Sequence, residues 1–221
     1  MPKKAFEEMT IATEALIAMS YGAMETLNGK LPYHNRLHAW DVVRAANGIG
    51  SLAVNRGLIK PKDLLVLLFA SATHDLVQGE TEHGANERMS AEMAADWMRK
   101  FKVFSKKDIK RAGSAILATM SDPIKPGYQQ TAGDDYIEQA LCDADMSQVG
   151  MPPNRSSVRS ERLYKELLGD DLDTPEFRLS FLNKQLFFYS KHQFYTDEAR
   201  ILFPFKQLNI ERTVRELESL G

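Results

Sequence analysis

The sequence has almost no cysteine, little net charge and no long apolar run. The single cysteine, Cys142, excludes an internal disulfide and fits a reducing compartment. A formal net charge of -2 argues against a protein that binds a nucleic-acid duplex through bulk positive charge. The longest apolar run, Leu64 to Thr73, is about half of the ~20 residues that a membrane span needs. We therefore expect a soluble protein without a membrane partner.

The beginning of the chain also lacks the features of a secretion signal. Glu7, Glu8 and Glu14 interrupt its apolar residues, which is atypical of a signal peptide. Together with the lone cysteine, this predicts a cytoplasmic location.

Alternating strand patterns are missing as well, and helical periodicity dominates. With 43% apolar residues, a chain of 221 residues can bury one sizeable core. The sequence predicts an all-α fold, a single compact multi-helix domain over residues 1–221. The helices expected from the pattern cover residues 5–27, 35–56, 61–73, 86–101, 105–119, 134–148, 156–168, 175–195 and 205–220.

Four ionisable residues stand in apolar helical surroundings: His38, the adjacent pair His74 and Asp75, and Asp145. Burying a carboxylate without compensation costs several kcal/mol, roughly, so something should neutralise these groups. A divalent cation held by two imidazoles and two carboxylates is the simplest solution. A single histidine on an apolar face is more often a hydrogen-bonded core residue, but the combination favours a metal site.

Helical spacing supports convergence of these groups. His34 and His38 continue the apolar face of the helix expected over 35–56, provided that this helix already includes residue 34. Asp145 shares a face with Leu141, whereas Asp143 points elsewhere, so periodicity favours Asp145 as the functional carboxylate.

The same residues resemble the HD-domain superfamily of metal-dependent phosphohydrolases, whose pattern is a His, a His-Asp pair and a distant Asp on a helical scaffold. Within that superfamily, several segments are similar to the catalytic domain of cyclic-nucleotide phosphodiesterases. These segments are Pro32-Tyr33-His34-Asn35, His38-Ala39, Asp41-Val42, Ile116-Leu117-Ala118-Thr119 and Ala144-Asp145-Met146-Ser147. Their order and spacing are preserved from about Tyr33 to Ser147.

Other segments depart from the phosphodiesterase pattern. The next histidine, His83, follows the His-Asp pair after a longer stretch, and Met120 to Pro123 stand where a histidine is expected. Asn86 to Ala91 resemble bacterial HD proteins of unassigned substrate. The resemblance thus implies an HD phosphohydrolase and leaves a cyclic-nucleotide substrate open.

The resemblance also implies roles for individual residues. His38, His74, Asp75 and Asp145 would bind a first metal ion, and Asp75 could bridge to a second, more weakly held ion. His34 matches the general acid that protonates the leaving alkoxide.

Further residues are candidates for contacts around the metals or with substrate. Glu87 could help to hold the second metal ion and take part in catalysis. His83 could contact the same ion or the ligands around it, or be an exposed loop residue. Asp41 could orient His34 or His38, or have a surface or capping role. Thr119 could hydrogen-bond near the site or end a helix. Gln193 corresponds weakly to the glutamine that reads purines in phosphodiesterases.

The function expected from these inferences is metal-dependent hydrolysis of a phosphoester in a nucleotide-like substrate. The alternatives are a 3′,5′-cyclic-nucleotide phosphodiesterase, a nucleotide 5′-monophosphatase, and a silent HD module that binds a nucleotide or a partner. The cofactor would be one or two divalent ions, with Mn, Fe, Mg, Zn and Co undistinguished. The metal-site core would span about 33–147, helices over 156–221 would complete the pocket, and a homo-oligomer stays open.

Overall fold

A computed structural model of the chain describes residues 2–121, 130–169 and 174–220. Over these ranges the protein forms helices and one isolated β-bridge, between Ser121 and Gln130, and no strand, which confirms the all-α prediction. The helices are α1 Lys3–Asn28, α2 Arg36–Asn55, α3 Pro61–Thr73, α4 Ala85–Phe101, α5 Lys106–Ala118, α6 Tyr136–Asp145, the 3-10 helix η1 Met146–Gly150, α7 Pro153–Leu168, α8 Pro175–Lys191, α9 Asp197–Leu202 and α10 Lys206–Glu218.

The central helix is α3, which packs against α1, α2, α5 and α6. Its first turn begins with Pro61, whose fixed φ suits that position, and Asp63 accepts a hydrogen bond from the Lys60 amide at 3.0 Å. Leu67 and Phe69 are fully buried, and burial of each side chain stabilises the fold by about 1.5–3 kcal/mol. The apolar run that the sequence places at the centre of the fold is thus buried on several sides.

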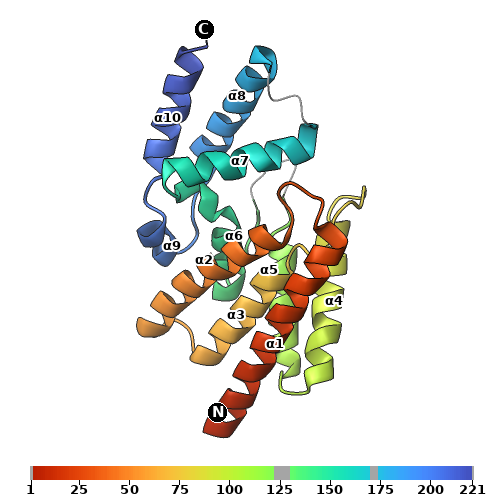
Figure 1. The fold of residues 1–221 in the computed structure, drawn as a ribbon. Helices are drawn as coiled ribbons and strands as arrows, with labels where there is room; N and C mark the ends of the chain where they lie inside the picture. Colours follow the sequence, from red (N-terminus) through yellow and green to blue (C-terminus); the bar gives the residue numbers. More distant parts are fainter. Residues whose placement is uncertain (1, 122–129, 170–173, 221) are drawn as a thin grey trace.

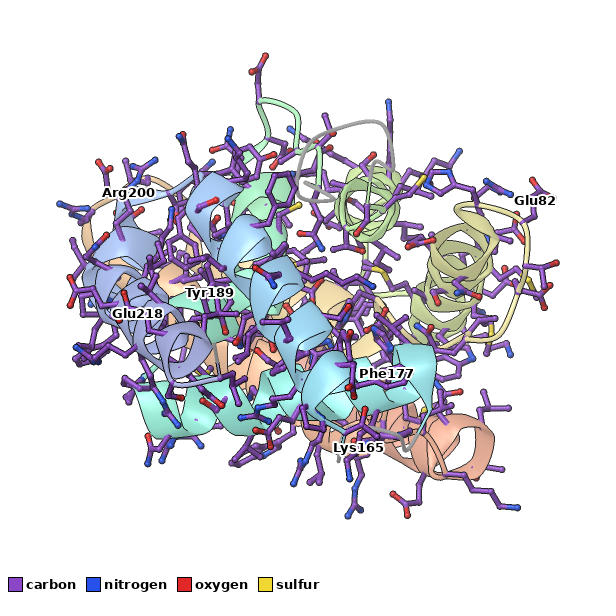
Figure 2. The ribbon with its side chains drawn as sticks, turned by 90° about the horizontal axis from the view of Figure 1, so that it is seen from above. Glu82, Lys165, Phe177, Tyr189, Arg200 and Glu218 are labelled. Carbon is purple, nitrogen blue, oxygen red and sulfur yellow. The ribbon has the colours of Figure 1, made fainter. Side chains whose placement is uncertain are left out.

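The C-terminal helices α7, α8 and α10 lie together at one end of the molecule, and α1 to α5 form the other end (Figure 1). Tyr189 of α8 is labelled in Figure 2, and this residue is only 2% exposed. Its hydroxyl is within hydrogen-bond distance of Ser156 Oγ (2.6 Å) and Ser160 Oγ (2.9 Å), both on α7. A buried aromatic residue with a satisfied hydroxyl therefore joins the two helices.

Several predicted helix boundaries differ from the observed ones by three residues or more; α7, for example, begins at Pro153 and not at residue 156. The helix predicted over 175–195 ends at Lys191, and the short helix α9 follows it. The cause is Asp143, whose carboxylate accepts hydrogen bonds from the Tyr195 and Thr196 amides and so holds this backbone extended before α9. The helix predicted over 134–148 changes to a 3-10 helix after Asp145.

The helix predicted over 35–56 agrees with α2 to within one residue, but it does not include His34, because α2 begins at Arg36. Asn35 caps this helix, since its side-chain oxygen accepts a hydrogen bond from the Leu37 amide at 2.9 Å. His34 therefore lies before the helix. The loop predicted over 123–133 falls mostly outside the described residues.

None of the described helices combines the length and the apolar character needed to cross a lipid bilayer.

Candidate metal centre

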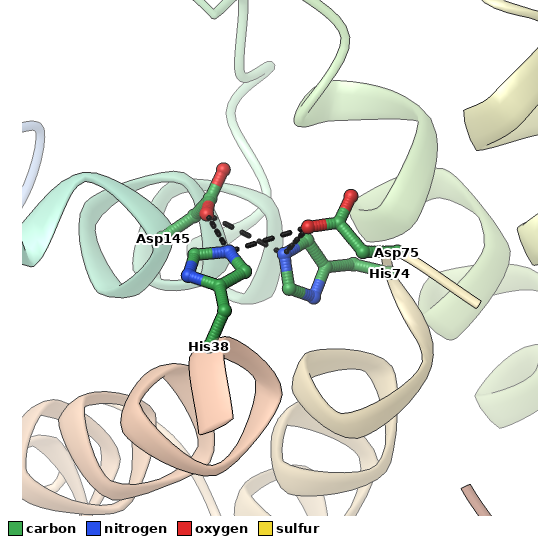
Figure 3. A group of neighbouring side chains, drawn as sticks. All are labelled: His38, His74, Asp75 and Asp145. Atoms are coloured by element: carbon green, nitrogen blue, oxygen red, sulfur yellow. Dashed lines mark ion pairs between the residues drawn. The ribbon is translucent and has the colours of Figure 1, made fainter. Parts of the chain in front are cut away.

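His38, His74, Asp75 and Asp145 come together at the ends of three helices (Figure 3). His38 lies in the first turn of α2, His74 and Asp75 directly follow α3, and Asp145 is the last residue of α6. One nitrogen or oxygen atom from each of the four residues lies within 4.8 Å of the others. The predicted convergence is confirmed, and the group could hold a metal ion.

The two imidazoles and two carboxylates alternate around a common point. His38 Nε2 lies 3.2 Å from Asp75 Oδ2 and 3.0 Å from Asp145 Oδ1. His74 Nε2 lies 3.0 Å from Asp75 Oδ2 and 3.4 Å from Asp145 Oδ1. Both Nε2 atoms are buried, and neither has a hydrogen-bond partner of good geometry among the described residues. All four atoms are therefore directed at a shared centre rather than at one another.

The tautomer of His74 is fixed by the backbone. Its Nδ1 lies 2.9 Å from the Ser71 carbonyl oxygen, which can only accept, so Nδ1 carries the proton. In the neutral ring, the lone pair on Nε2 is then free to bind a cation, which is the usual arrangement of a metal-binding histidine.

Each carboxylate offers one oxygen to the centre and has the other held by an amide. Asp75 Oδ1 accepts a hydrogen bond from Gln78 Nε2 at 3.0 Å. Asp145 Oδ2 accepts one from Gln130 Nε2 at 2.6 Å. Such partners fix the orientation of metal ligands. The donor set of two nitrogens and two oxygens suits Mn, Fe, Zn or Co, and its carboxylates also suit Mg.

The pKa values of the four side chains are shifted in ways that favour positive histidines beside negative carboxylates. Burial acts to lower the pKa of His38 and His74, but the attraction of Asp145 and Asp75 outweighs it, so both pKa values are raised. Burial acts to raise the pKa of the two carboxyls, but the histidines outweigh it and the net shift is downward. Protons on the imidazoles therefore provide the positive charge that a bound cation would otherwise supply.

His34 lies beside the group, with its ring centroid 5.8 Å from that of His38. Its Nδ1 is bound to the carboxylate of Glu166 on α7. The second oxygen of Glu166 accepts hydrogen bonds from the amides of Tyr33 (2.7 Å) and His34 (2.9 Å). Glu166 was not predicted from the sequence, because a single acidic residue on an amphipathic helix, 132 positions from His34, carries no local signal.

Tyr33 packs against the rings of both His34 and His38. Its ring centroid is 4.4 Å from that of His38, and its hydroxyl donates a hydrogen bond to Gln148 Oε1 at 3.1 Å. Burial, and then the charges of Asp145 and Asp75, raise the pKa of the Tyr33 phenol, so this group stays neutral.

Two candidates have structural contacts elsewhere. Asp41 forms an ion pair with Arg159 of α7, not with either neighbouring histidine. Thr119 ends α5, where its hydroxyl donates to the Ile116 carbonyl at 2.7 Å.

The remaining candidates lie outside the four-residue group. A ring nitrogen of His83 binds the Ser121 carbonyl at 2.8 Å, and the residue is exposed. Glu87 is half-buried in the first turn of α4. Gln193 is exposed and lines a small cavity that also contains Gln130, the partner of Asp145.

Asp143 and Cys142, which are also on α6, make structural hydrogen bonds outside the candidate metal centre. Asp143 accepts three hydrogen bonds, from the Tyr195 amide (2.8 Å), the Thr196 amide (2.7 Å) and the Thr196 hydroxyl (2.7 Å). The Cys142 thiol is buried and donates to the Ala118 carbonyl at 3.2 Å, and burial raises its pKa well above the usual value. The preference for Asp145 over Asp143 at the centre is therefore confirmed.

A larger cavity of about 460 Å³ is lined by residues around Arg56, Tyr136 and Glu198, and none of the four clustered residues contributes to it.

Comparison with protein-family models gives no match, and comparison with curated proteins gives none either.

Proposed function

We propose that the protein is a metal-dependent phosphohydrolase of the HD type that cleaves a phosphoester of a nucleotide-like substrate. The observation that carries this proposal is the convergence of His38, His74, Asp75 and Asp145 from three separate helices. Four ionisable side chains, each at most 14% exposed, would be costly to bury together without a cation.

The residues fit a cation whose bound water is far more acidic than bulk water, which is the chemistry that such an ion supplies to hydrolysis. The protein itself would do three things. His38 and His74 present neutral nitrogens, Asp75 and Asp145 present charged oxygens, and Gln78 and Gln130 keep those carboxylates in place.

His34 is suited to the role of general acid. Its Nδ1 is held by Glu166, which leaves Nε2 available to give a proton to a leaving alkoxide. Glu166 also accepts from the Tyr33 and His34 amides, so it can fix the orientation of the ring, as expected of a residue behind a proton donor.

The HD resemblance and the His34–Glu166 pair favour an ester with a poor leaving group. A 3′,5′-cyclic nucleotide and a nucleotide 5′-monophosphate both meet this condition, since each releases an alkoxide. Asp75 could bridge to a second ion, and Glu87 on α4 is the candidate to help hold it.

The test is a substrate panel with the purified protein loaded with Mn²⁺, Co²⁺ or Mg²⁺. Cyclic nucleotides, 5′-mononucleotides and bis-p-nitrophenyl phosphate would be offered to the wild type and to the Asp75→Ala and Asp96→Ala variants. Asp96 is a matched control, because its side chain is 66% exposed and forms a surface ion pair with Arg99.

We expect loss of metal and of activity together in Asp75→Ala and no change in Asp96→Ala. Turnover of mononucleotides alone would remove the diesterase alternative. A wild type that binds metal and nucleotide but hydrolyses nothing in the panel would reject the enzyme and favour a silent binding module.

A further inference from the structure

Gln130 connects the candidate metal centre to a small cavity. Its Nε2 donates to Asp145 Oδ2 at 2.6 Å, and its backbone carbonyl accepts from the Tyr195 hydroxyl at 2.6 Å. The residue is 6% exposed, and its Oε1 is buried without a hydrogen-bond partner among the described residues. A buried acceptor left without a donor costs about 1–3 kcal/mol, so we expect a hydrogen-bond donor beside Gln130 Oε1.

His192 lines the same cavity and is also incompletely bonded. It directly follows α8 and is 7% exposed, and its Nε2 has no hydrogen-bond partner in the described parts of the chain. Two buried polar side chains, each with an unused atom, therefore line one cavity.

The size of this cavity decides what can fill it. Its volume is about 20 Å³, and Cys142, Met146 and Phe188 complete much of its wall. A water molecule needs about 10–15 Å³ of such space, whereas a nucleobase is several times larger. The cavity, which both His192 and Gln130 line, thus has room for one water molecule and excludes a substrate ring.

The protonation state of His192 suits a donor role. Burial, and then the charge of Lys206, lowers the pKa of His192 to about 4, so the ring is neutral at pH 7. In the tautomer that carries its proton on Nε2, the ring can donate to a water that in turn donates to Gln130 Oε1.

The orientation of the Gln130 amide depends on such a donor. Nitrogen and oxygen occupy nearly equal space in a glutamine amide, so contacts on both sides decide which atom faces Asp145. If the oxygen turned toward Asp145, two negative atoms would meet and the carboxylate would lose its partner. A donor at Oε1 favours the productive orientation.

We propose that His192 is a positioning residue which, through one bound water, fixes the Gln130 amide so that its Nε2 holds the metal-ligating carboxylate of Asp145. The proposal rests on the cation site of the proposed function. It assigns to the C-terminal part of the chain a direct influence on the affinity of that site.

The test is a double-mutant cycle read by Mn²⁺ dissociation constants rather than by activity. Loss of a partner behind a metal ligand weakens metal binding about 10–100-fold, so we expect a shift of that order for His192→Phe and for Gln130→Leu. The double variant should bind no more weakly than Gln130→Leu alone, because His192 acts through Gln130. His192→Gln, which keeps a side-chain donor, should restore most of the affinity.

The proposal would be overturned if His192→Phe lowered the Mn²⁺ affinity equally with Gln130 and with Leu at position 130. It would also be overturned if His192→Phe lowered the affinity in neither case. If His192→Phe only weakened folding, it would lower the thermal midpoint of the metal-free protein, and its effect on the Mn²⁺ dissociation constant would not depend on the residue at position 130.

A second measurement needs no metal and separates this proposal from the proposed function. In the metal-free protein, NMR of the Gln130 side-chain amide should show slow hydrogen exchange in the wild type and in His192→Gln, and faster exchange in His192→Phe. Unchanged exchange in His192→Phe would refute the positioning role even if the wild type bound no Mn²⁺. A wild type without Mn²⁺ binding would refute the metal site alone.

Discussion

His34 is held by Glu166 and is not one of the four candidate metal ligands, so a substitution of His34 tests proton transfer without removing a metal ligand. His34→Asn should retain the bound metal and lower kcat about 10²–10⁴-fold for substrates with an alkoxide leaving group, because the proton donor is lost. The same variant should hydrolyse bis-p-nitrophenyl phosphate almost normally, since p-nitrophenolate leaves without protonation. Metal analysis and steady-state kinetics with both substrates measure the difference.

Glu166→Gln is the control for orientation. The amide oxygen can still accept from the Tyr33 and His34 backbones, but the negative charge beside the ring is lost. We expect a smaller loss of kcat and a change in its pH profile. Full activity of His34→Asn toward an alkyl ester would contradict the assignment of His34.

The shifted pKa values of the cluster predict opposite pH dependences with and without metal. The raised pKa values of His38 and His74 contribute stability below pH 6.5, which is lost as pH rises through the raised values. The lowered pKa values of Asp75 and Asp145 contribute stability above pH 3.8, which is lost as pH falls through the lowered values. The metal-free protein should therefore receive most stability from this cluster between pH 3.8 and 6.5.

Metal binding requires the imidazoles to lose their protons, so the affinity for a cation should rise with pH above 6.5. Thermal unfolding at several pH values, with chelator and with excess Mn²⁺, measures both trends. Because a ligand that binds only the folded state adds stability, the gap between the two curves should widen with pH. Parallel curves would contradict a cation site at these histidines.

Among the helices, α9 depends on one buried acid. Asp143→Ala would remove three hydrogen bonds to the backbone and hydroxyl groups of Tyr195 and Thr196, and leave the buried Thr196 amide and the partly buried Tyr195 amide without this acceptor. We expect the free energy of unfolding to fall by about 2–4 kcal/mol, measured by urea denaturation.

Asp197→Ala is the control on the same helix. The Asp197 carboxylate is 74% exposed and pairs with Arg200, itself 53% exposed, so solvent screens this interaction. The expected change is within about 0.5 kcal/mol. Similar losses from both variants would show that the hydrogen bonds to Asp143 are not what holds this segment.

Helices with a strong local signal were predicted well from the sequence. The α3 boundaries agree with the prediction, because Pro61 marks the start and the apolar run ends at Thr73. The segment after Lys191 was predicted wrongly, because its periodic residues continue the pattern of α8 while a carboxylate from α6 interrupts it. An interaction across 52 residues, such as that of Asp143 with the Tyr195 amide, leaves no trace in a local pattern.

The residues of the site also differ in the strength of their local signals. His38, His74, Asp75 and Asp145 were found because each is a polar residue on a strongly apolar face. Glu166 was not, because α7 is amphipathic and a carboxylate on it is unremarkable in sequence terms. His34 was correctly placed near the centre, but its position depends on Glu166 and not on a continuous helix.

For the molecule as a whole, Gly150 marks the place where η1 meets the segment between α9 and α10. Its carbonyl accepts a hydrogen bond from the Phe205 amide at 3.1 Å. A Cβ at this position would lie 2.1 Å from the Phe203 carbonyl oxygen, so backbone would have to move. Gly150→Ala should lower the free energy of unfolding by about 3 kcal/mol or more and loosen the C-terminal helices.

Gly113 provides the matched control, because it lies inside α5 and a Cβ there would meet nothing within 4 Å. Gly113→Ala should stabilise the protein by about 0.5–1 kcal/mol, since alanine loses less conformational freedom in a helix. Denaturant titration of both variants gives the comparison. A Gly150→Ala variant as stable as the wild type would show that the junction adapts without cost.

The buried thiol has a practical consequence for spectroscopy. Cys142 is the only cysteine of the chain, is 1% exposed and has a raised pKa, so little of it is in the reactive thiolate form. A cysteine introduced at an exposed position would be the one sulfur open to a maleimide in the folded protein. Fluorophores or spin labels can thus be attached at chosen points without first replacing the native residue.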